Sequence, residues 1–445
     1  MTKTALDIAI VGAGMGGLTT AITLGRLGHR VTVYERTAAL RPVGSALSVW
    51  QNGVKVLRAL GLGDRIDAVS GRMHSMAYRN KQGQVLTSFS LAPLYEASGE
   101  SARPIGRTAL QEILLDAVRA MAAPVGEDPA KEATGNPAGV QSGVHLATAC
   151  VDFAQDDEGV DVVLADGRQV RADLLIVADG SRSAMRSKVV GTDIARSYRG
   201  YVNWNGRIAV SPDLADAHEW LQFVGDGKRV SLMPMGGDQF YFFFDVPLPL
   251  GTINDPGTYR EELSAHFAGW AEPVQKLIQR FDPSIVARVE IHDTVPLSSL
   301  VNGRVALLGD AAHAMTPDLG QGGCQAMEDA WVLSQCLLSC SDDPKQALLD
   351  YQAARCERVG SIVARARTRA ELIHGSAFAA GRAIDETVEA DAMPEVASEA
   401  KKAQLSERDS SVSVATANWY QALASENGDA IIAGLLKTMQ GGPLK

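Results

Sequence analysis

A glycine-rich turn between a short apolar strand and a helix constrains the fold of this chain more than any other feature. Residues 7–11 form an apolar, strand-sized run, and residues 15–28 carry apolar side chains at helical spacing before a glycine. Residues 30–34 are again rich in β-branched side chains. This order predicts a βαβ unit and therefore a parallel sheet with helices on its faces.

The turn itself predicts a dinucleotide site, because Gly12, Gly14 and Gly17 satisfy the pattern G-x-G-x-x-G. In that pattern the glycines permit a tight turn, a close approach by a pyrophosphate, and close packing of helix on strand. The helix N-terminus adds free N–H groups and a partial positive charge. Glu35 ends the second strand, close to the ~20-residue spacing of a carboxylate that binds ribose. The same fingerprint contains two further predicted cofactor contacts, Gly16 and Arg36. NAD and FAD both remain open.

The composition is that of an ordinary globular protein. Of 445 residues, 52 are acidic and 42 basic, so the broad basic surface that nucleic acid or an anionic membrane requires is not expected. The sequence contains no apolar run long enough for a membrane span or a signal peptide. Five irregularly spaced cysteines favour neither a disulfide framework nor a metal site, and we expect a reduced, cytoplasmic protein.

The rest of the chain changes between sheet-like and helical patterns. Residues 201–246 predict an antiparallel sheet inserted into the first domain, and residues 305–308 return to the strand pattern of the opening. Residues 325–340 and 344–373 predict long helices. Two insertions are also predicted, at residues 122–143 and 384–412. Composition favours a surface loop for the first and leaves a solvated helix or a mobile segment open for the second.

Two later segments carry further motifs. The apolar strand at residues 174–177 leads into D-G-x-x-S-x-x-R, from Asp179 to Arg186. The strand ending at Leu308 leads into G-D-A-A-H, followed by Pro317 and a glycine-rich segment. In this order and spacing, the motifs resemble those of the class A flavin-dependent monooxygenases, the family that includes para-hydroxybenzoate hydroxylase.

The resemblance covers most of the chain and implies an α/β protein. Its parts are a Rossmann-like FAD-binding fold with a mixed sheet, an inserted antiparallel-sheet substrate domain and C-terminal helices. The implied domains are residues 1–75, 104–190 and 290–375 for FAD, residues 76–103 and 191–289 for the substrate, and a C-terminal helical region at residues 376–445.

The resemblance also implies which residues hold FAD. Asp310 can accept hydrogen bonds from the ribityl hydroxyls, and the N–H groups of residues 320–323 can face the flavin edge that becomes anionic on reduction. In the family, Asp179 and Arg186 lie where the flavin domain also meets the nicotinamide cofactor, although a satisfied strand-end turn is an equally open interpretation of Asp179. Beyond the dinucleotide turn, the implied FAD contacts are Ser48, Arg107, Cys150, Asp179, Asp310, Gly320, Gln321, Gly322, Gly323 and Cys324. His313 is expected to shape the flavin site rather than to act as a base.

Further segments resemble the urate-hydroxylating branch of this family: residues 42–50, 200–206, 227–234, 240–247 and 320–324. This implies that NADH reduces FAD, that the reduced flavin captures O₂ as a C4a-hydroperoxide, and that urate is hydroxylated at C5 to 5-hydroxyisourate. A methylated urate, another hydroxylated N-heterocycle or a phenol remains open as the substrate. A flavin-bound redox sensor that does not hydroxylate also remains open.

The resemblance implies that three side chains bind the flat, electron-rich urate anion, and their chemistry suits that role. The planar fork of Arg229 can pair with two neighbouring acceptors, and Asn203 offers a donor and an acceptor to a lactam edge. Tyr241 can orient the ring or the arginine, so Arg229 and Tyr241 are the predicted catalytic residues, with Pro317 and Gly322 completing the substrate site. The plainer interpretations are a surface arginine, a solvent-facing asparagine and a tyrosine packed in its sheet. We expect a small-molecule substrate and a monomer or homodimer.

Overall fold

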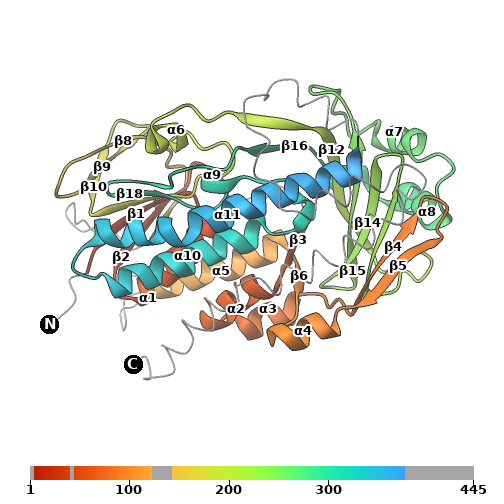
Figure 1. Ribbon diagram of the computed structural model, residues 1–445, viewed down its shortest axis with the longest axis horizontal. Coiled ribbons are helices and arrows are strands. Elements are labelled where there is room, and N and C mark those ends of the chain that lie inside the picture. Colours follow the sequence, from red (N-terminus) through yellow and green to blue (C-terminus); the bar gives the residue numbers. More distant parts are fainter. Residues whose placement is uncertain (1–4, 41–44, 123–142, 376–445) are drawn as a thin grey trace, which may run out of the picture.

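The structure, a computed structural model, describes residues 5–40, 45–122 and 143–375 (Figure 1). A six-stranded sheet lies toward one end of the elongated molecule and a seven-stranded sheet toward the other. Helix α11 (Pro344–His374) packs along α10 (Gly322–Ser339) and reaches from the first sheet to the second. These two helices therefore tie the two sheet regions together.

The six-stranded sheet confirms the predicted βαβ unit. Helix α1 (Met15–Arg26) connects β1 to β2, and β1 pairs in parallel with both β2 and β11. The central strands β1 and β11 are almost entirely apolar and buried, as expected for a parallel sheet that is covered on both faces. The order across the sheet is β17 (Val301–Asn302), β18 (Val305–Leu307), β11 (Leu174–Val177), β1 (Asp7–Val11), β2 (Arg30–Tyr34) and β7 (Gly143–His145).

The helices of this region match the sequence predictions closely. Helix α1 packs against α5 (Arg107–Ala122) and α10. Helix α10 begins three residues before the predicted start at residue 325, because Gly322 and Gly323 adopt helical backbone despite their low intrinsic propensity. Its first turn is closed by the bond from Gln325 N–H to the carbonyl of Gln321, at 2.8 Å.

The second sheet is antiparallel, as predicted, except at one pair of strands. Strand β4 arrives from the N-terminal part of the chain and pairs in parallel with β13, a long-range pairing that hydrophobic patterns do not reveal. The order is β16 (Ala287–Thr294), β12 (Arg196–Ala209), β15 (Gln239–Pro247), β14 (Lys228–Met235), β13 (Glu219–Gly225), β4 (Ser75–Asn80) and β5 (Val85–Ser90).

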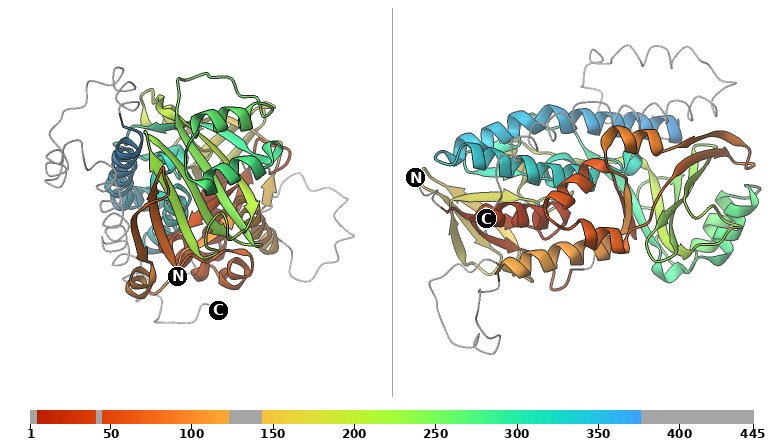
Figure 2. Two further views of the ribbon diagram at one scale, coloured as in Figure 1. Left: turned by 90° about the vertical axis from the view of Figure 1, so that its right-hand side faces the viewer. Right: turned by 90° about the horizontal axis from the view of Figure 1, so that it is seen from below.

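The two faces of this sheet have different roles. Phe242 and Phe244 pack in the core beneath α7 (Tyr259–His266) and α8 (Glu272–Arg280), which cover the far end of the molecule (Figure 2). Because side chains alternate along a strand, Tyr241, Phe243 and Asp245 belong to the opposite face. That face, which looks toward the first sheet region, is where polar side chains gather.

Smaller elements complete the described residues. Two minor sheets contain β8 (Cys150–Gln155), β9 (Val160–Leu164) and β10 (Gln169–Ala172), and β3 (Ala46–Val49) with β6 (Arg103–Gly106). The remaining helices are α2 (Gln51–Ala59), α3 (Gly63–Val69), α4 (Ala92–Ser98), α6 (Arg186–Val190) and α9 (Asp310–His313), with short 3₁₀ turns at Pro283–Ile285 and Pro317–Leu319.

Some predictions fall on parts of the chain that the structure does not describe. The interior of the insertion at 122–143, all of the insertion at 384–412 and the C-terminal region 376–445 lie outside the described residues. Strand β16 crosses the proposed domain boundary at residue 290 and pairs with β12, and the division into domains stays a prediction. Within the described ranges, none of the helices combines the length and apolarity needed to cross a membrane.

Candidate functional site

Three glycines of the first turn are required by the fold, because a larger side chain would be strained or would clash there. The fourth faces open space. Gly12 has φ +103°, and a Cβ on Gly17 would lie 1.9 Å from the carbonyl oxygen of Gly12. A Cβ on Gly16 would lie 2.6 Å from a methyl carbon of Leu308. A Cβ on Gly14 would meet nothing within 4 Å. Gly14 is therefore the position where a ligand can approach the backbone.

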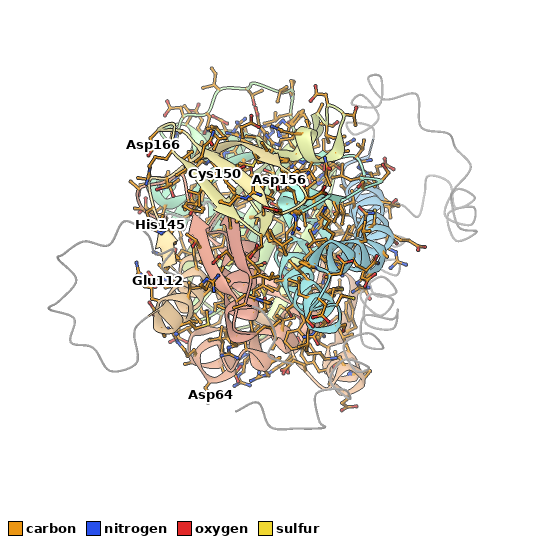
Figure 3. The ribbon with its side chains drawn as sticks, turned by 90° about the vertical axis from the view of Figure 1, so that its left-hand side faces the viewer. Asp64, Glu112, His145, Cys150, Asp156 and Asp166 are labelled. Carbon is orange, nitrogen blue, oxygen red and sulfur yellow. The ribbon has the colours of Figure 1, made fainter. Side chains whose placement is uncertain are left out.

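Glu35 directly follows β2 of the six-stranded sheet, whereas Cys150 belongs to the three-stranded sheet. The Glu35 carboxylate accepts hydrogen bonds at 2.9 Å from the backbone N–H groups of Ala13 and Thr37, so it is held beside the turn. Cys150 begins β8 (Figure 3), and burial raises the pKa of its thiol to about 12. A thiol of this kind stays protonated, which leaves the backbone as the part of Cys150 available to a cofactor. Arg36 is exposed beside Glu35.

Arg186 joins the two later motifs. Its buried guanidinium donates to the main-chain carbonyls of Ser181, Asp310 and Ala311, at 3.0, 2.9 and 2.6 Å. The motif ending at Arg186 is thereby fastened to G-D-A-A-H, while the carboxylate side of Asp310 remains exposed. The Asp179 carboxylate accepts from Ala184 N–H at 3.0 Å. A role for Asp179 and Arg186 toward the nicotinamide cofactor stays a prediction.

Replacing Arg186, which joins the two motifs, is expected to weaken cofactor binding. In Arg186→Met, three main-chain carbonyls lose their donor, and the buried carbonyl of Ala311 alone is expected to cost roughly 1–3 kcal/mol when left unsatisfied. We expect FAD affinity to fall at least about tenfold and the melting temperature to drop. Flavin release on dilution and thermal unfolding measure the two effects. A variant that retains FAD like the wild type would contradict this role of Arg186.

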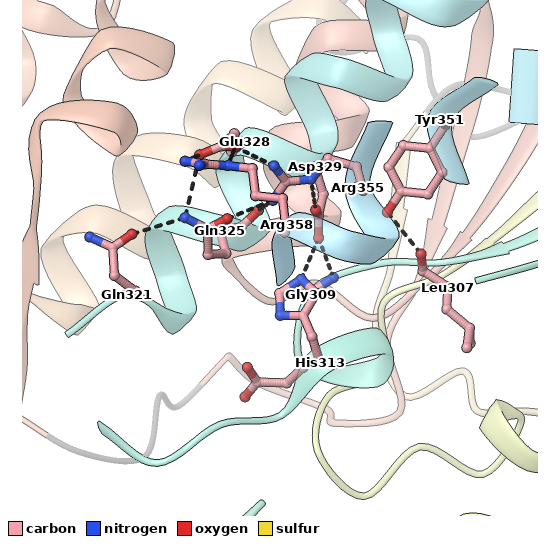
Figure 4. Close-up of polar contacts among 12 residues, drawn as sticks. Leu307, Gly309, His313, Gln321, Gln325, Glu328, Asp329, Tyr351, Arg355 and Arg358 are labelled. Carbon is pink, nitrogen blue, oxygen red and sulfur yellow. Dashed lines mark hydrogen bonds and ion pairs between the residues drawn. The ribbon is translucent and has the colours of Figure 1, made fainter. Parts of the chain in front are cut away.

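A second buried network holds the G-D-A-A-H segment, residues 309–313, in place (Figure 4). Asp329 accepts from Gly309 N–H at 2.9 Å, from His313 Nε2 at 2.6 Å and from Arg355 Nε at 2.6 Å. His313 is only 2% exposed and its ring is held by Asp329, and its role in shaping the flavin site rather than acting as a base stays a prediction. Glu328 is bonded to Arg355 and to the neighbouring Arg358. The network fixes the start of α9 to α10 and α11.

Two predicted cofactor residues direct their side chains into the protein. Gln321 Oε1 accepts from the side chains of Asn52 and Gln325, at 3.1 and 3.0 Å. The sulfur of Cys324 accepts from Trp50 N–H at 3.2 Å. The Oε1 of Gln321 and the sulfur of Cys324 are therefore engaged by the protein itself.

The buried network makes stability depend on pH in a defined direction. Burial alone would raise the pKa of Glu328, but Arg355 and Arg358 lower it to about 2. Because the folded pKa lies below the unfolded value of about 4.3, the contribution is complete above that value and is lost as pH falls toward 2. It amounts to about 3 kcal/mol. Urea unfolding across this range is expected to give a shallower pH dependence for Glu328→Gln than for the wild type, and identical slopes would contradict this account.

A cavity of about 290 Å³ brings the two halves of the predicted site together. One side of it is formed by residues between Asp310 and Gly323, which we call the flavin loop, and the other by the polar face of the seven-stranded sheet. The predicted residues that line it are Ser48, Arg107, Asn203, Arg229, Tyr241, Asp310, Pro317, Gly320, Gly322 and Gly323. The glycines of the first turn, Glu35, Arg36, Cys150 and Asp179 are not part of this lining.

Strand register explains how Arg229 is placed. Strands β14, β15 and β12 pair so that Arg229, Asp245 and Asn203 stand in one row across the sheet. Arg229 Nε donates to Asp245 at 2.8 Å, and Nη2 donates to Asp318 at 2.9 Å. Asn203 Nδ2 donates to Asp245 at 2.6 Å. Since Arg229 is 3% exposed and Asn203 is also buried, the surface interpretations of both residues are wrong.

Contrary to the sequence prediction, the Arg229 guanidinium does not offer two nitrogens to a ligand; two of its three nitrogens bind protein carboxylates. Nε and Nη2 of Arg229 bind carboxylates, which leaves Nη1 as the nitrogen without an acceptor among the described residues. Burial alone would raise the pKa of Asp318, but the charge of Arg229 outweighs it and the pKa is lowered. Two carboxylates thus hold one cation, and the cluster is formally negative.

Tyr241 and the apolar walls give the cavity its shape. The Tyr241 ring lies 5.8 Å from that of Phe243, and Arg229 lies 5.0 Å from the Phe243 ring centre. Burial raises the pKa of Tyr241, so its hydroxyl keeps its proton and can donate. No described residue hydrogen-bonds that hydroxyl. Apolar side chains make up much of the remaining lining: Leu47, Met233, Phe243, Val289, Ile291 and Met315.

Sequence reasoning missed the two carboxylates that hold Arg229. Asp245 lies two and four residues after Phe243 and Tyr241, so the two-residue period of a strand puts it on their face. An acid inside an aromatic strand was therefore an available signal. Asp318 follows the predicted Pro317 directly, but nothing in its local sequence indicates a partner on β14.

The fold, together with the cavity between the flavin loop and the seven-stranded sheet, defines a flavin-binding protein. Residues 5–366 match the family described as the FAD binding domain, and the chain belongs to that family. The residues present fit the cofactor, because Gly14 faces open space, Asp310 is exposed beside the cavity and the start of α10 lines it. This confirms the predicted fold class.

The chain is also similar over nearly its full length to enzymes of known activity. The chain is 44% identical to FAD-dependent urate hydroxylase of Klebsiella pneumoniae over 436 residues, which cover 98% of this chain and 99% of the relative. It is 40% identical over 442 residues to FAD-dependent urate hydroxylase of Mycolicibacterium vanbaalenii, covering 99% and 98%. The crystal structure of Klebsiella pneumoniae HpxO complexed with FAD and uric acid has a TM-score of 0.76 and 42% identity, covering 99% of this chain and 98% of that one.

Proposed function

We propose that the protein is a flavin-dependent monooxygenase that hydroxylates urate at C5. Urate, O₂, NADH and a proton become 5-hydroxyisourate, water and NAD⁺. The observation that carries this proposal is the cavity whose lining includes both the flavin loop and Arg229. Two buried carboxylates hold the Arg229 guanidinium in place. The two urate hydroxylases to which the chain is similar over nearly its full length support the same substrate.

The cofactor supplies the redox chemistry when bound, since it takes a hydride from NADH and activates O₂. The backbone at Gly14 would hold its pyrophosphate, Asp310 its ribityl chain, and the start of α10 its flavin edge. The protein side chains need only bind, orient and shield the substrate.

The substrate side of the cavity is built for a flat, polar ring. Arg229 Nη1 and the Tyr241 hydroxyl present donors from fixed positions. Asn203 also lines the cavity, but its Nδ2 donates to Asp245 and its Oδ1 accepts from Asn205. Because Asp245 and Asp318 hold the guanidinium from two sides, its free edge is aimed before the ligand arrives, which reduces the cost of orienting the substrate. The apolar walls exclude water from the reacting ring.

The direct test is a turnover assay with the purified yellow holoenzyme. We expect urate to accelerate NADH oxidation while the absorbance of urate falls, and a parallel assay with NADPH tests the choice of electron donor. Intact urate during NADH consumption would show that urate is not the substrate. Methylated urates, other N-heterocycles and phenols are then compared by product formation and peroxide release. A redox sensor would yield no hydroxylated product from any of them.

We also propose that the protein acts in the cytoplasm as a monomer or homodimer. All five cysteines are free thiols, which agrees with a reducing compartment. Sedimentation of the holoenzyme measures the oligomeric state.

A further inference from the structure

An amide with one unpartnered end lies on the substrate side of the cavity. Gln222, on β13, is 1% exposed and its side chain lines the cavity. Its Nε2 position lies 2.7 Å from the hydroxyl oxygen of Tyr78, whereas the Oε1 position has no hydrogen-bond partner among the described residues. A buried polar group in this state is unfavourable unless a water or a ligand completes it.

Arg369 determines which end of the amide is unpartnered. Its Nη2 donates to the Tyr78 hydroxyl oxygen at 2.9 Å, and its Nε donates to the main-chain carbonyl of Asp318 at 3.2 Å. A guanidinium can only donate, so the Tyr78 hydroxyl accepts from Arg369 and has its own proton to give. Within the described part of the chain, the Gln222 amide is the other group that hydrogen-bonds Tyr78.

The two ends of a carboxamide have nearly the same shape, so their partners decide its orientation. The carbonyl oxygen of Gln222 is the end that can accept the Tyr78 proton, and the distance of 2.7 Å suits an O–H···O bond. This orientation places the NH₂ group at the unpartnered position. Gln222, one of the residues that line the cavity, then carries a buried neutral donor, and Arg369 and Tyr78 hold its amide in this orientation.

We propose that Gln222 is a substrate-binding residue that sets specificity, because its NH₂ group donates to a carbonyl oxygen or unprotonated ring nitrogen of the purine. Tyr78 and Arg369 are positioning residues that hold the amide. The inference rests on the proposed function, since it takes urate as the ligand. Two carboxylates already balance the charge of Arg229, so the oxygens of a urate anion need neutral donors as well. Such a donor favours oxo-purines over rings that present no acceptor there.

The test is a titration of oxidised holoenzyme with urate, followed by the change in flavin absorbance without NADH. In Gln222→Leu the donor is removed, and we expect Kd to rise about fivefold. Gln222→Glu still accepts the Tyr78 proton but presents an oxygen to the urate anion, and we expect a rise of more than about tenfold. Tyr78→Phe releases the amide and is expected to raise Kd about threefold. FAD content is expected to match the wild type throughout, and the matched control Gln82→Glu, on an exposed turn of the same sheet, is expected to leave Kd unchanged.

Each other outcome has a distinct meaning. Wild-type Kd in both Gln222 variants would overturn the assignment. A normal Kd in Gln222→Glu together with weak binding in Gln222→Leu would show that an oxygen faces the ligand, and would overturn the donor role. If the wild type shows no urate binding, the proposed function fails and the assignment of Gln222 falls with it. Urate bound equally by the wild type and the Gln222 variants leaves the function standing and removes only this inference.

Discussion

Arg229→Gln is expected to abolish urate hydroxylation, with kcat/KM lower by about a thousandfold and with FAD content unchanged. The substitution removes the Nη1 donor from the cavity and leaves Asp245 and Asp318 buried without their cation. Breaking a buried ion pair in this way costs about 3–5 kcal/mol of stability. Product formation by mass spectrometry and the free energy of unfolding in urea measure the two effects.

Matched variants separate the loss of charge from the loss of geometry. Arg280→Gln removes a half-exposed arginine that pairs with Asp213, and its effect on unfolding is expected to stay below about 1 kcal/mol. Arg229→Lys keeps the charge without the fork, and we expect partial stability with little activity. Adding Asp245→Asn to Arg229→Gln is expected to recover stability because one uncompensated charge is removed. Normal turnover by Arg229→Gln would remove Arg229 from the reaction.

Two glycines of the first turn are expected to respond in opposite ways. In Gly14→Val the new Cβ meets no protein atom within 4 Å, so we expect the apoprotein to melt like the wild type while FAD affinity falls at least about a hundredfold. In Gly17→Ala the new Cβ would lie 1.9 Å from the Gly12 carbonyl oxygen, and we expect a loss of roughly 1–3 kcal/mol or more. Thermal unfolding of apoprotein and flavin titration measure these effects. Full FAD affinity in Gly14→Val would show that the pyrophosphate does not approach there.

Local patterns predicted the FAD-binding half of the fold well. Strands β1 and β2 match their predicted bounds, because uninterrupted apolar runs beside a glycine turn allow few alternatives. The start of α10 was placed too late, since glycines count against a helix in any propensity argument while here they begin one. The parallel pairing of β13 with β4 could not be predicted, because it joins residues 144 positions apart along the chain, such as Ser75 and Glu219.

In the site, too, the sequence predicted individual residues but not the contacts between distant segments. Arg229, Asn203 and Tyr241 were identified from their motifs, and the structure places all three on one cavity. What holds Arg229 was not identified, because Asp245 is 16 residues away and Asp318 is 89 residues away. Only the register of β14 with β15 and the position of the flavin loop bring these groups together. The amide of Gln222 was missed for a similar reason, since its partners come from β4 and α11.

The most direct measurement is the fate of isotopically labelled O₂ in a reaction of holoenzyme, NADH and urate. If the cavity holds urate beside the flavin, the product is expected to carry one labelled oxygen atom, and one NADH is expected to be consumed for each product formed. Unlabelled product, or intact urate with all of the reducing equivalents recovered as peroxide, would contradict the account.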